Sequence, residues 1–301
     1  MTRRTLADVY DVALSVSACA RSGTRADVAW MVSPAATNQA VAFTPGGGRV
    51  GQLAGGAFDG LLADVAARRL SHGRLVAHEV TAIEAPLCDL AVGTPVEFLI
   101  VPADQLPSDI WSILLAHRPV GITARVEQSE VIALEVVTPD SAEGRLAEML
   151  RSGDPAVETD AGTILTVFAP IPRLVIAGGG PFAEALGAQG RLLGWQVAAE
   201  TRPEMVAGLA ASLSDLDAIV VMGHDVETSS RCLLAALEGD AGYIGALGSP
   251  AMQEARADWL AYRDVTDLTR VHGPAGLPLG GRSPAEVAVS IVAEILDERS
   301  D

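Results

Sequence analysis

The sequence contains no lysine, so all 21 of its basic residues are arginines, set against 38 acidic residues and a formal net charge of −17. A Walker-type phosphate loop, a Schiff-base lysine and a lysine general base all need an ammonium group and are therefore excluded. Binding of nucleic acid over a broad surface needs clustered positive charge, which so acidic a chain does not supply. We expect protein or small-molecule partners and no nucleic acid.

Cysteine is also scarce, with Cys19, Cys88 and Cys232 as the three examples and no C-x-x-C spacing among them. An odd number of cysteines without metal-ligand spacing favours a reducing cytoplasm. Cys19 and Cys232 lie in helix-like apolar patterns, so we interpret them as core residues. The histidines show no metal-ligand spacing either, so no metal site is predicted.

No apolar run approaches the length needed to cross a bilayer, so no membrane segment is predicted. The segment ending in Ala18-Cys19-Ala20 superficially resembles a signal peptide, but Asp8 and Asp11 fall where such a peptide is uncharged. Apolar residues recur there at helical spacing, which predicts a first amphipathic helix. Its apolar face is expected to hold Leu6, Val9, Tyr10, Ala13 and Leu14.

A glycine-rich turn stands between a strand-like and a helix-like segment. Leu174–Ala177 is a short apolar run, and Gly178, Gly180 and Ala183 then supply G-x-G-x-x-A spacing, with Gly179 between the first two. In this context the first glycine permits a tight turn, the second lets backbone approach a phosphate, and the small third residue keeps the helix close to the sheet. The helix N-terminus adds a positive end. A phosphate-binding turn is predicted.

Polar residues follow the next strand-like segments. Glu200 ends one of them twenty residues after Gly180, where a carboxylate accepts a hydrogen bond from a ribose hydroxyl, and Arg202 comes directly afterwards. His224 and Asp225 follow the strand-like segment 217–223. We expect these four residues to contact a bound pterin, nucleotide or phosphate. For His224 and Asp225 the alternative is a pair that caps the following helix, and for Arg202 it is a solvated surface arginine.

Two further glycine-containing segments have both a binding and a purely structural interpretation. Gly248 and Ser249 would hold an anion at a helix start, or simply turn the chain. Gly55 and Gly56 would let a cofactor approach the backbone closely, or form a plain left-handed turn.

With 301 residues and an apolar fraction of 49%, the chain is expected to form two domains. Residues 1–150 mix helix-like and strand-like segments without a βαβ rhythm, which predicts an α+β domain. Residues 151–172 are expected to be a linker and the last strand of that domain. Residues 173–301 alternate strand and helix, which predicts a Rossmann-like parallel sheet. Its glycine- and proline-rich segment 271–286 is interpreted as a long loop before a final helix.

The second half resembles the C-terminal domain of the XdhC/CoxI family, accessory proteins of molybdenum hydroxylases such as xanthine and carbon monoxide dehydrogenases. Five blocks in the same order carry the resemblance: Ala177–Gly180, Glu200–Arg202, Val221–Asp225, Tyr243–Ser249 and His272–Glu286. The resemblance implies a cofactor-binding chaperone more than an enzyme. It would bind molybdenum cofactor (molybdopterin) between its domains and deliver it to the large subunit of an apo molybdenum hydroxylase, with a cofactor sulfurase as a further partner. A homodimer is implied as well.

The first half departs from the family pattern. Gly55-Gly56 is similar to the family's Gly-Gly-Cys-Glu-type segment, but Ala57 takes the cysteine position and the acid is Asp59. Sulfur transfer through that thiol is therefore not expected. Two alternatives stay open: an NAD(P)-dependent oxidoreductase, in which Glu200 would favour NAD because a carboxylate repels a 2′-phosphate, or a non-catalytic partner subunit of a motif-complete relative.

Overall fold

The structure is a computed structural model that describes residues 9–35, 37–153 and 155–299. The chain divides into two compact units, Met1–Pro170 and Ile171–Asp301. The first is α+β with an antiparallel sheet, and the second carries a parallel sheet, so the expected fold class is confirmed.

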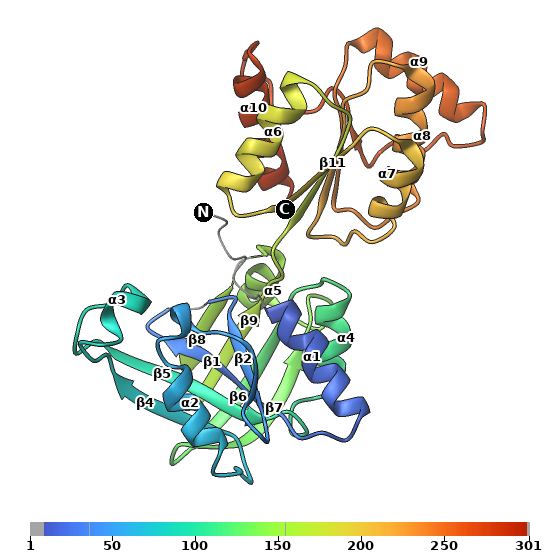
Figure 1. Cartoon of the computed structure of the whole chain (residues 1–301). Helices are drawn as coiled ribbons and strands as arrows, with labels where there is room; N and C mark the ends of the chain where they lie inside the picture. Colours follow the sequence, from blue (N-terminus) through green and yellow to red (C-terminus); the bar gives the residue numbers. More distant parts are fainter. Residues whose placement is uncertain (1–8, 36, 154, 300–301) are drawn as a thin grey trace. The chain divides into compact units, whose positions relative to one another are not determined.

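The N-terminal unit is built on a nine-stranded sheet with the order β3-β2-β1-β5-β4-β7-β6-β9-β8 (Figure 1). Neighbouring strands pair antiparallel along it. The strands are β1 (Asp27–Ser33), β2 (Ala40–Thr44), β3 (Gly48–Gly51), β4 (Arg74–Glu79), β5 (Pro95–Pro102), β6 (Val120–Glu127), β7 (Glu130–Val137), β8 (Ala156–Asp160) and β9 (Thr163–Phe168).

Helices cover both faces of this sheet. On one face α1 (Val9–Arg21) and α4 (Asp109–Leu115) pack with Val28 and Trp30 of β1, and on the other α2 (Asp59–Ala66) packs with Ala29 and Met31. The alternation follows from the two-residue period of a strand. The remaining short helices are η1 (Ala54–Gly56), α3 (Ala85–Cys88) and α5 (Gly144–Arg151). Within the described ranges, no helix has the length and apolar character required to cross a membrane.

Two expectations for this unit were wrong. Leu14 was assigned to the apolar face of the first helix, but it is 51% exposed, because the helix buries Val9, Val12, Ala13 and Val16 instead; Leu6 lies outside the described residues. The segment 151–172 was interpreted as a linker with one strand. It also contains β8, which pairs with β9 at the edge of the nine-stranded sheet and so belongs to the N-terminal unit.

The C-terminal unit has a five-stranded parallel sheet with the order β11-β10-β12-β13-β14. Its strands are β10 (Arg173–Ala177), β11 (Gln196–Glu200), β12 (Ala218–Val221), β13 (Tyr243–Ala246) and β14 (Val271–His272). The fifth strand corrects the interpretation of 271–286 as entirely loop, since Val271 and His272 pair with Ile244 and Gly245. The strand β10 therefore lies between β11 and β12. The chain first adds β11 on one side of β10 and then returns to add β12, β13 and β14 on the other side.

Alternate residues of β10 and β12 build two cores. Leu174 and Ile176 pack on the side of α6 (Pro181–Leu192) and α10 (Pro284–Glu298). Val175 and Ile219 pack on the side of α7 (Pro203–Ala210), α8 (Val226–Leu237) and α9 (Pro250–Ala261) (Figure 1). A capping box of Ser283 and Glu286 begins α10.

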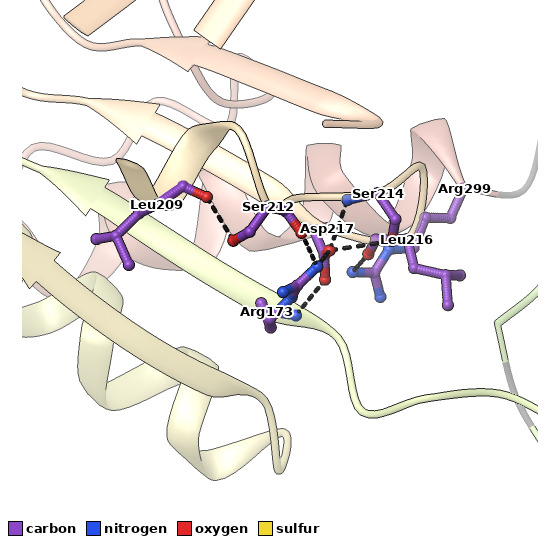
Figure 2. Close-up of polar contacts among 7 residues, drawn as sticks. All are labelled: Arg173, Leu209, Ser212, Ser214, Leu216, Asp217 and Arg299. Carbon is purple, nitrogen blue, oxygen red and sulfur yellow. Dashed lines mark hydrogen bonds and ion pairs between the residues drawn. The ribbon is translucent and has the colours of Figure 1, made fainter. Parts of the chain in front are cut away.

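A buried carboxylate ties the amino ends of β10 and β12 together (Figure 2). Asp217 has a side chain that is 0% exposed and accepts hydrogen bonds from the backbone N–H of Arg173 at 2.7 Å and that of Ser214 at 2.8 Å. The guanidinium of Arg173 pairs with the same carboxylate at 2.6 Å and also donates to the carbonyl oxygen of Ser212. This network leaves the opposite, carboxyl edge of the sheet for ligands.

Candidate functional site

The turn after β10 brings backbone close to β12. The backbone N–H of Met222 donates to the carbonyl oxygen of Ala177 at 2.8 Å, and Gly178 has φ +145°. A Cβ atom on Gly178 would lie 3.1 Å from the Cβ of Met222 and 3.2 Å from its carbonyl carbon. A glycine adopts this positive φ without strain and without displacing Met222, as its spacing in the sequence indicated.

The next two residues form the start of α6. Gly180 is the N-cap, with φ +88° and ψ −172°, and Pro181 occupies the first turn. A Cβ atom on Gly179 would meet the Cγ2 atom of Thr201 at 3.6 Å, an ordinary contact, so this position has room for a side chain. An anion in front of Gly179 therefore meets exposed backbone and the positive end of the α6 dipole.

A pocket of about 220 Å³ lies beside this turn. It opens at the carboxyl ends of β10 and β12, the point where the strand order reverses and where doubly wound sheets bind their ligands. Its lining combines the turn, the loop after β12 and the first turns of α8: Ala177, Gly178, Gly179, Thr201, Met222, Gly223, His224, Asp225, Thr228, Ser229 and Cys232. Four of the residues expected at the site, Gly178, Gly179, His224 and Asp225, are thus brought together.

Asp225 and His224 play different parts in the pocket. Asp225 is the N-cap of α8 and accepts a hydrogen bond from the backbone N–H of Thr228 at 2.7 Å, which lowers the pKa of its carboxyl. The alternative interpretation of Asp225, as a cap of the following helix, is therefore confirmed. His224 is exposed and makes no hydrogen bond or ion pair within the described part of the chain. Its imidazole is free to meet a ligand at the pocket mouth.

Glu200 and Arg202 form a pair with each other next to the pocket rather than within its lining. The guanidinium of Arg202 donates to Glu200 Oε1 at 3.0 Å and Oε2 at 2.7 Å, and the backbone N–H groups of Thr201 and Arg202 donate to Oε1 as well. These bonds lower the pKa of Glu200 from 4.5 to about 2. A ribose hydroxyl at this carboxylate would have to share it with Arg202.

Cys232 contributes a thiol to the pocket wall. It is 3% exposed and also packs in the core between the sheet and α8, as its sequence position indicated. Burial raises the pKa of this thiol, so it stays protonated at neutral pH and is a poor nucleophile. The wall therefore offers no activated sulfur to a ligand.

Arg256 is a residue that the sequence analysis did not identify. It lies on α9 and is 1% exposed, and no ion pair with it is found among the described residues. Its guanidinium donates to the carbonyl oxygens of Gly223 at 2.7 Å and Leu247 at 3.0 Å, and to the hydroxyl of Ser229 at 2.9 Å. Burial lowers its pKa.

Gly223 and Ser229 both line the pocket. Arg256, which is not part of the lining, is hydrogen-bonded to both residues and so places a positive charge next to the pocket. Arginine is rarely buried this far without a carboxylate partner. An anion in the pocket would supply the missing negative charge. The sequence signal was an arginine on the apolar stripe of a helix, four residues before the buried Leu260.

The remaining expected site residues lie outside this pocket. Ser249 is the N-cap of α9 and accepts from the backbone N–H of Met252, while Gly248 has φ +153° and turns the chain into that helix. Gly55 and Gly56 have φ +69° and +87°, and a Cβ atom on Gly55 would lie 2.8 Å from the carbonyl oxygen of Leu87. The absence of a side chain at Gly55 lets α3 approach closely.

Comparison with known proteins gives a family match within the C-terminal unit. Residues 174–295 match the family model of the XdhC Rossmann domain, which confirms the resemblance seen in the five sequence blocks. The uncharacterized protein YqeB of Escherichia coli (strain K12) is 26% identical over 204 residues, covering 60% of this chain but only 37% of YqeB. A crystal structure of a xanthine dehydrogenase from Bacillus halodurans is similar with a TM-score of 0.47 and 19% identity, over 95% of each chain.

Proposed function

We propose, from the premise that residues 174–295 are a Rossmann domain of the XdhC family, that the chain is an accessory protein for the maturation of a molybdenum hydroxylase of the xanthine dehydrogenase type. In this proposal the C-terminal unit holds molybdenum cofactor by its phosphate, and the chain passes it to the large subunit of the apo-enzyme. The observation that supports the proposal is the glycine turn beside a pocket at the strand-order reversal within this family domain.

The residues present fit an anionic group. Gly178 lies where a Cβ would press against Met222, Gly179 leaves the helix start open, and Arg256 adds a buried charge that no described carboxylate neutralises. A pocket of about 220 Å³ is smaller than the roughly 300–1,000 Å³ of sites that enclose a whole ligand. It would therefore hold the phosphate end, with the pterin extending past the exposed His224.

Within this function the chain binds and orients its cargo and carries out no chemistry upon it. Bound cofactor would supply the molybdenum-carrying pterin that the hydroxylase uses. The backbone around Gly179 would hold the phosphate, and the imidazole of His224 is placed to donate a hydrogen bond at the pocket mouth. Since Cys232 is a buried, protonated thiol, sulfuration of the cofactor would belong to a separate sulfurase.

A dinucleotide oxidoreductase is the rival function. Against it, the acid that would accept the ribose hydroxyls is already bound by Arg202 on both oxygens. The arginine beside that acid also removes the selectivity for NAD that Glu200 alone would give, because a guanidinium accommodates a 2′-phosphate. The two functions predict different bound molecules.

The test compares wild-type protein with Gly179→Asp and Gly179→Asn, each purified from a host supplied with molybdate. Both side chains fit at this position, but only the aspartate repels a phosphate. Mass spectrometry of the released small molecules is expected to find a pterin with the wild type, much less than a tenth of it with Gly179→Asp, and an intermediate amount with Gly179→Asn.

Other outcomes would redirect the assignment. NAD(P) released from the wild type, with reduction of an added substrate, would replace the proposal by an oxidoreductase. Protein that binds neither molecule until a second chain is added would favour a non-catalytic partner subunit, for which Ala57 in the family's cysteine position is the motivation.

A further inference from the structure

A larger cavity lies within the N-terminal unit, formed by residues 25–69 alone. It measures about 750 Å³ and opens between the turn joining β2 to β3, helix α2 and the residues before β1. Its lining is Arg25, Asp27, Phe43, Thr44, Pro45, Gly46, Gly47, Gly48, Arg49, Asp59, Gly60, Ala63, Ala66, Ala67 and Arg69. None of the residues in the Rossmann pocket takes part.

Both carboxylates of this cavity are already engaged. Asp27 is 4% exposed, and Arg25 donates to its two oxygens at 2.9 and 3.3 Å. Asp59 is 3% exposed, pairs with Arg49 through Oδ2 at 2.7 Å, and accepts from the backbone N–H of Leu53 through Oδ1 at 3.3 Å. Each acid is therefore paired with an arginine, although Asp59 Oδ2 accepts no hydrogen bond within the described residues.

The cavity wall instead retains unused donors. A guanidinium carries five N–H groups, and Arg25 and Arg49 use only part of theirs on the two aspartates. Arg69 follows α2 in a left-handed conformation with φ +52°, and its guanidinium makes no hydrogen bond or ion pair among the described residues. Three arginines against two paired acids leave a net positive cavity on a chain of net charge −17. Such a wall selects a ligand rich in acceptors and negatively charged.

The other walls are apolar or small. Phe43 and Pro45 form one side, and Gly60, Ala63 and Ala67 of the α2 region leave the other side open. A volume of about 750 Å³ is within the roughly 300–1,000 Å³ range of small-molecule sites. A free inorganic anion would leave most of this space to water.

We propose that this cavity is a second ligand site, and that it binds an organic phosphate of nucleotide size with the phosphate held by Arg69 and the unused donors of Arg25 and Arg49. The body of the ligand lies against Phe43 and the small face of α2. This site is independent of the proposed function, because it uses neither the turn after β10 nor the family domain.

The experiment is isothermal titration calorimetry with 5′-AMP and pyridoxal 5′-phosphate as probes, and with adenosine and pyridoxal as their uncharged counterparts. It uses the full chain carrying Gly179→Asp, so that the Rossmann pocket is blocked. Arg69→Gln removes the free guanidinium, and Arg68→Gln removes the same charge from the neighbouring exposed residue, which does not line the cavity. Ala67→Phe fills the cavity from an exposed position.

At least one phosphorylated probe is expected to bind the Gly179→Asp protein, about tenfold or more weakly after Arg69→Gln or Ala67→Phe, and unchanged after Arg68→Gln. Its uncharged counterpart is expected to bind much more weakly. Failure of both phosphorylated probes to bind, or binding that Arg69→Gln leaves intact, overturns the proposal. The pterin content of the wild-type protein tests the proposed function separately.

Discussion

Single side chains at the C-terminal site differ most in how their charges are neutralised. Glu200 is held by an adjacent arginine and by backbone N–H groups, whereas Arg256 is buried with only neutral oxygens around it. A paired carboxylate needs nothing further, while a buried cation without a counterion favours the arrival of an anion. The two residues therefore lead to separate predictions.

The pKa of Glu200 should be measurably depressed. Arg202 and the backbone hold it at about 2, below the ordinary 4.5, so the stability contributed by this pair is complete above pH 4.5 and is lost as the pH falls through about 2. Titration of the Glu200 carboxyl carbon by NMR should show this value, and Arg202→Gln should raise it towards 4.5. Arg231→Gln, which removes an exposed arginine paired with Glu204, should leave it unchanged. An ordinary pKa in the wild type would contradict the pairing.

Arg256 should control anion binding at the Rossmann pocket. In Arg256→Met the carbonyl oxygen of Gly223 and the hydroxyl of Ser229 lose their donor, and the charge behind the pocket disappears. Binding of pyrophosphate, measured by calorimetry, should weaken about tenfold or more, since charge-assisted bonds of about 1.5–3 kcal/mol depend on this group.

The matched control is Arg263→Met, which removes the same charge just after the same helix but from an exposed arginine lying over Trp259. Equal losses of pyrophosphate binding in the two variants would show that only the net charge of the protein matters. The position of Arg256 beside the pocket would then make no contribution to binding. Hydrogen exchange of the amides from Gly223 to Ser229 should increase in Arg256→Met alone.

The elements of the C-terminal unit are joined at both ends of the sheet, by polar groups of different kinds. At the carboxyl ends, glycines and N-caps leave donors exposed for a ligand. At the amino ends, Asp217 satisfies the backbone of Arg173 and Ser214 and pairs with the Arg173 guanidinium (Figure 2). The polar groups of the amino end are therefore paired with one another, whereas those of the carboxyl end remain available to the ligand proposed above.

Asp217→Ala should be strongly destabilising. It leaves the Arg173 guanidinium, 22% exposed, without its partner and leaves two backbone N–H groups without acceptors. The free energy of unfolding of the C-terminal unit should fall by about 3 kcal/mol in urea melts, the lower end for breaking a buried pair because the arginine is partly hydrated. Asp240→Ala, at an exposed aspartate without a described side-chain contact, should change it by less than about 0.5 kcal/mol. A small effect of Asp217→Ala would mean that water replaces the carboxylate.

At the scale of the whole molecule, each unit has its own buried clusters: three in Met1–Pro170 and two in Ile171–Asp301. Units with separate cores unfold separately unless they are strongly coupled. The chain should therefore give two calorimetric transitions.

Two variants assign these transitions. Asp217→Ala should lower the transition of the C-terminal unit only. Thr166→Val should lower the other, because it removes the acceptor of the buried Trp30 indole N–H, which lies 3.1 Å from the Thr166 hydroxyl. Pyrophosphate bound in the Rossmann pocket should raise the first transition only. A single transition that moves with both variants would show that the units unfold together.

Much of the C-terminal fold and part of its site were predictable from the sequence because the signals are local. Gly178 and Gly180 in the turn and Asp225 as an N-cap each act within a few residues of themselves, so spacing alone reveals them. The edge strand β8 was missed because its sequence is rich in polar residues and its pairing with β9 decides its structure.

By itself the sequence excluded lysine chemistry and determined the glycine turn after β10, the N-cap at Asp225 and the two fold classes, all of which depend on composition or on neighbours along the chain. Only the tertiary structure decided that β10 lies between β11 and β12, so that the turn, His224 and Cys232 share one pocket. It also decided that Arg256 reaches Gly223, 33 residues away, and that Arg25, Arg49 and Arg69 meet around one cavity. The reason is that these contacts join segments far apart in the chain, and strand order and packing, which no local spacing encodes, bring them together.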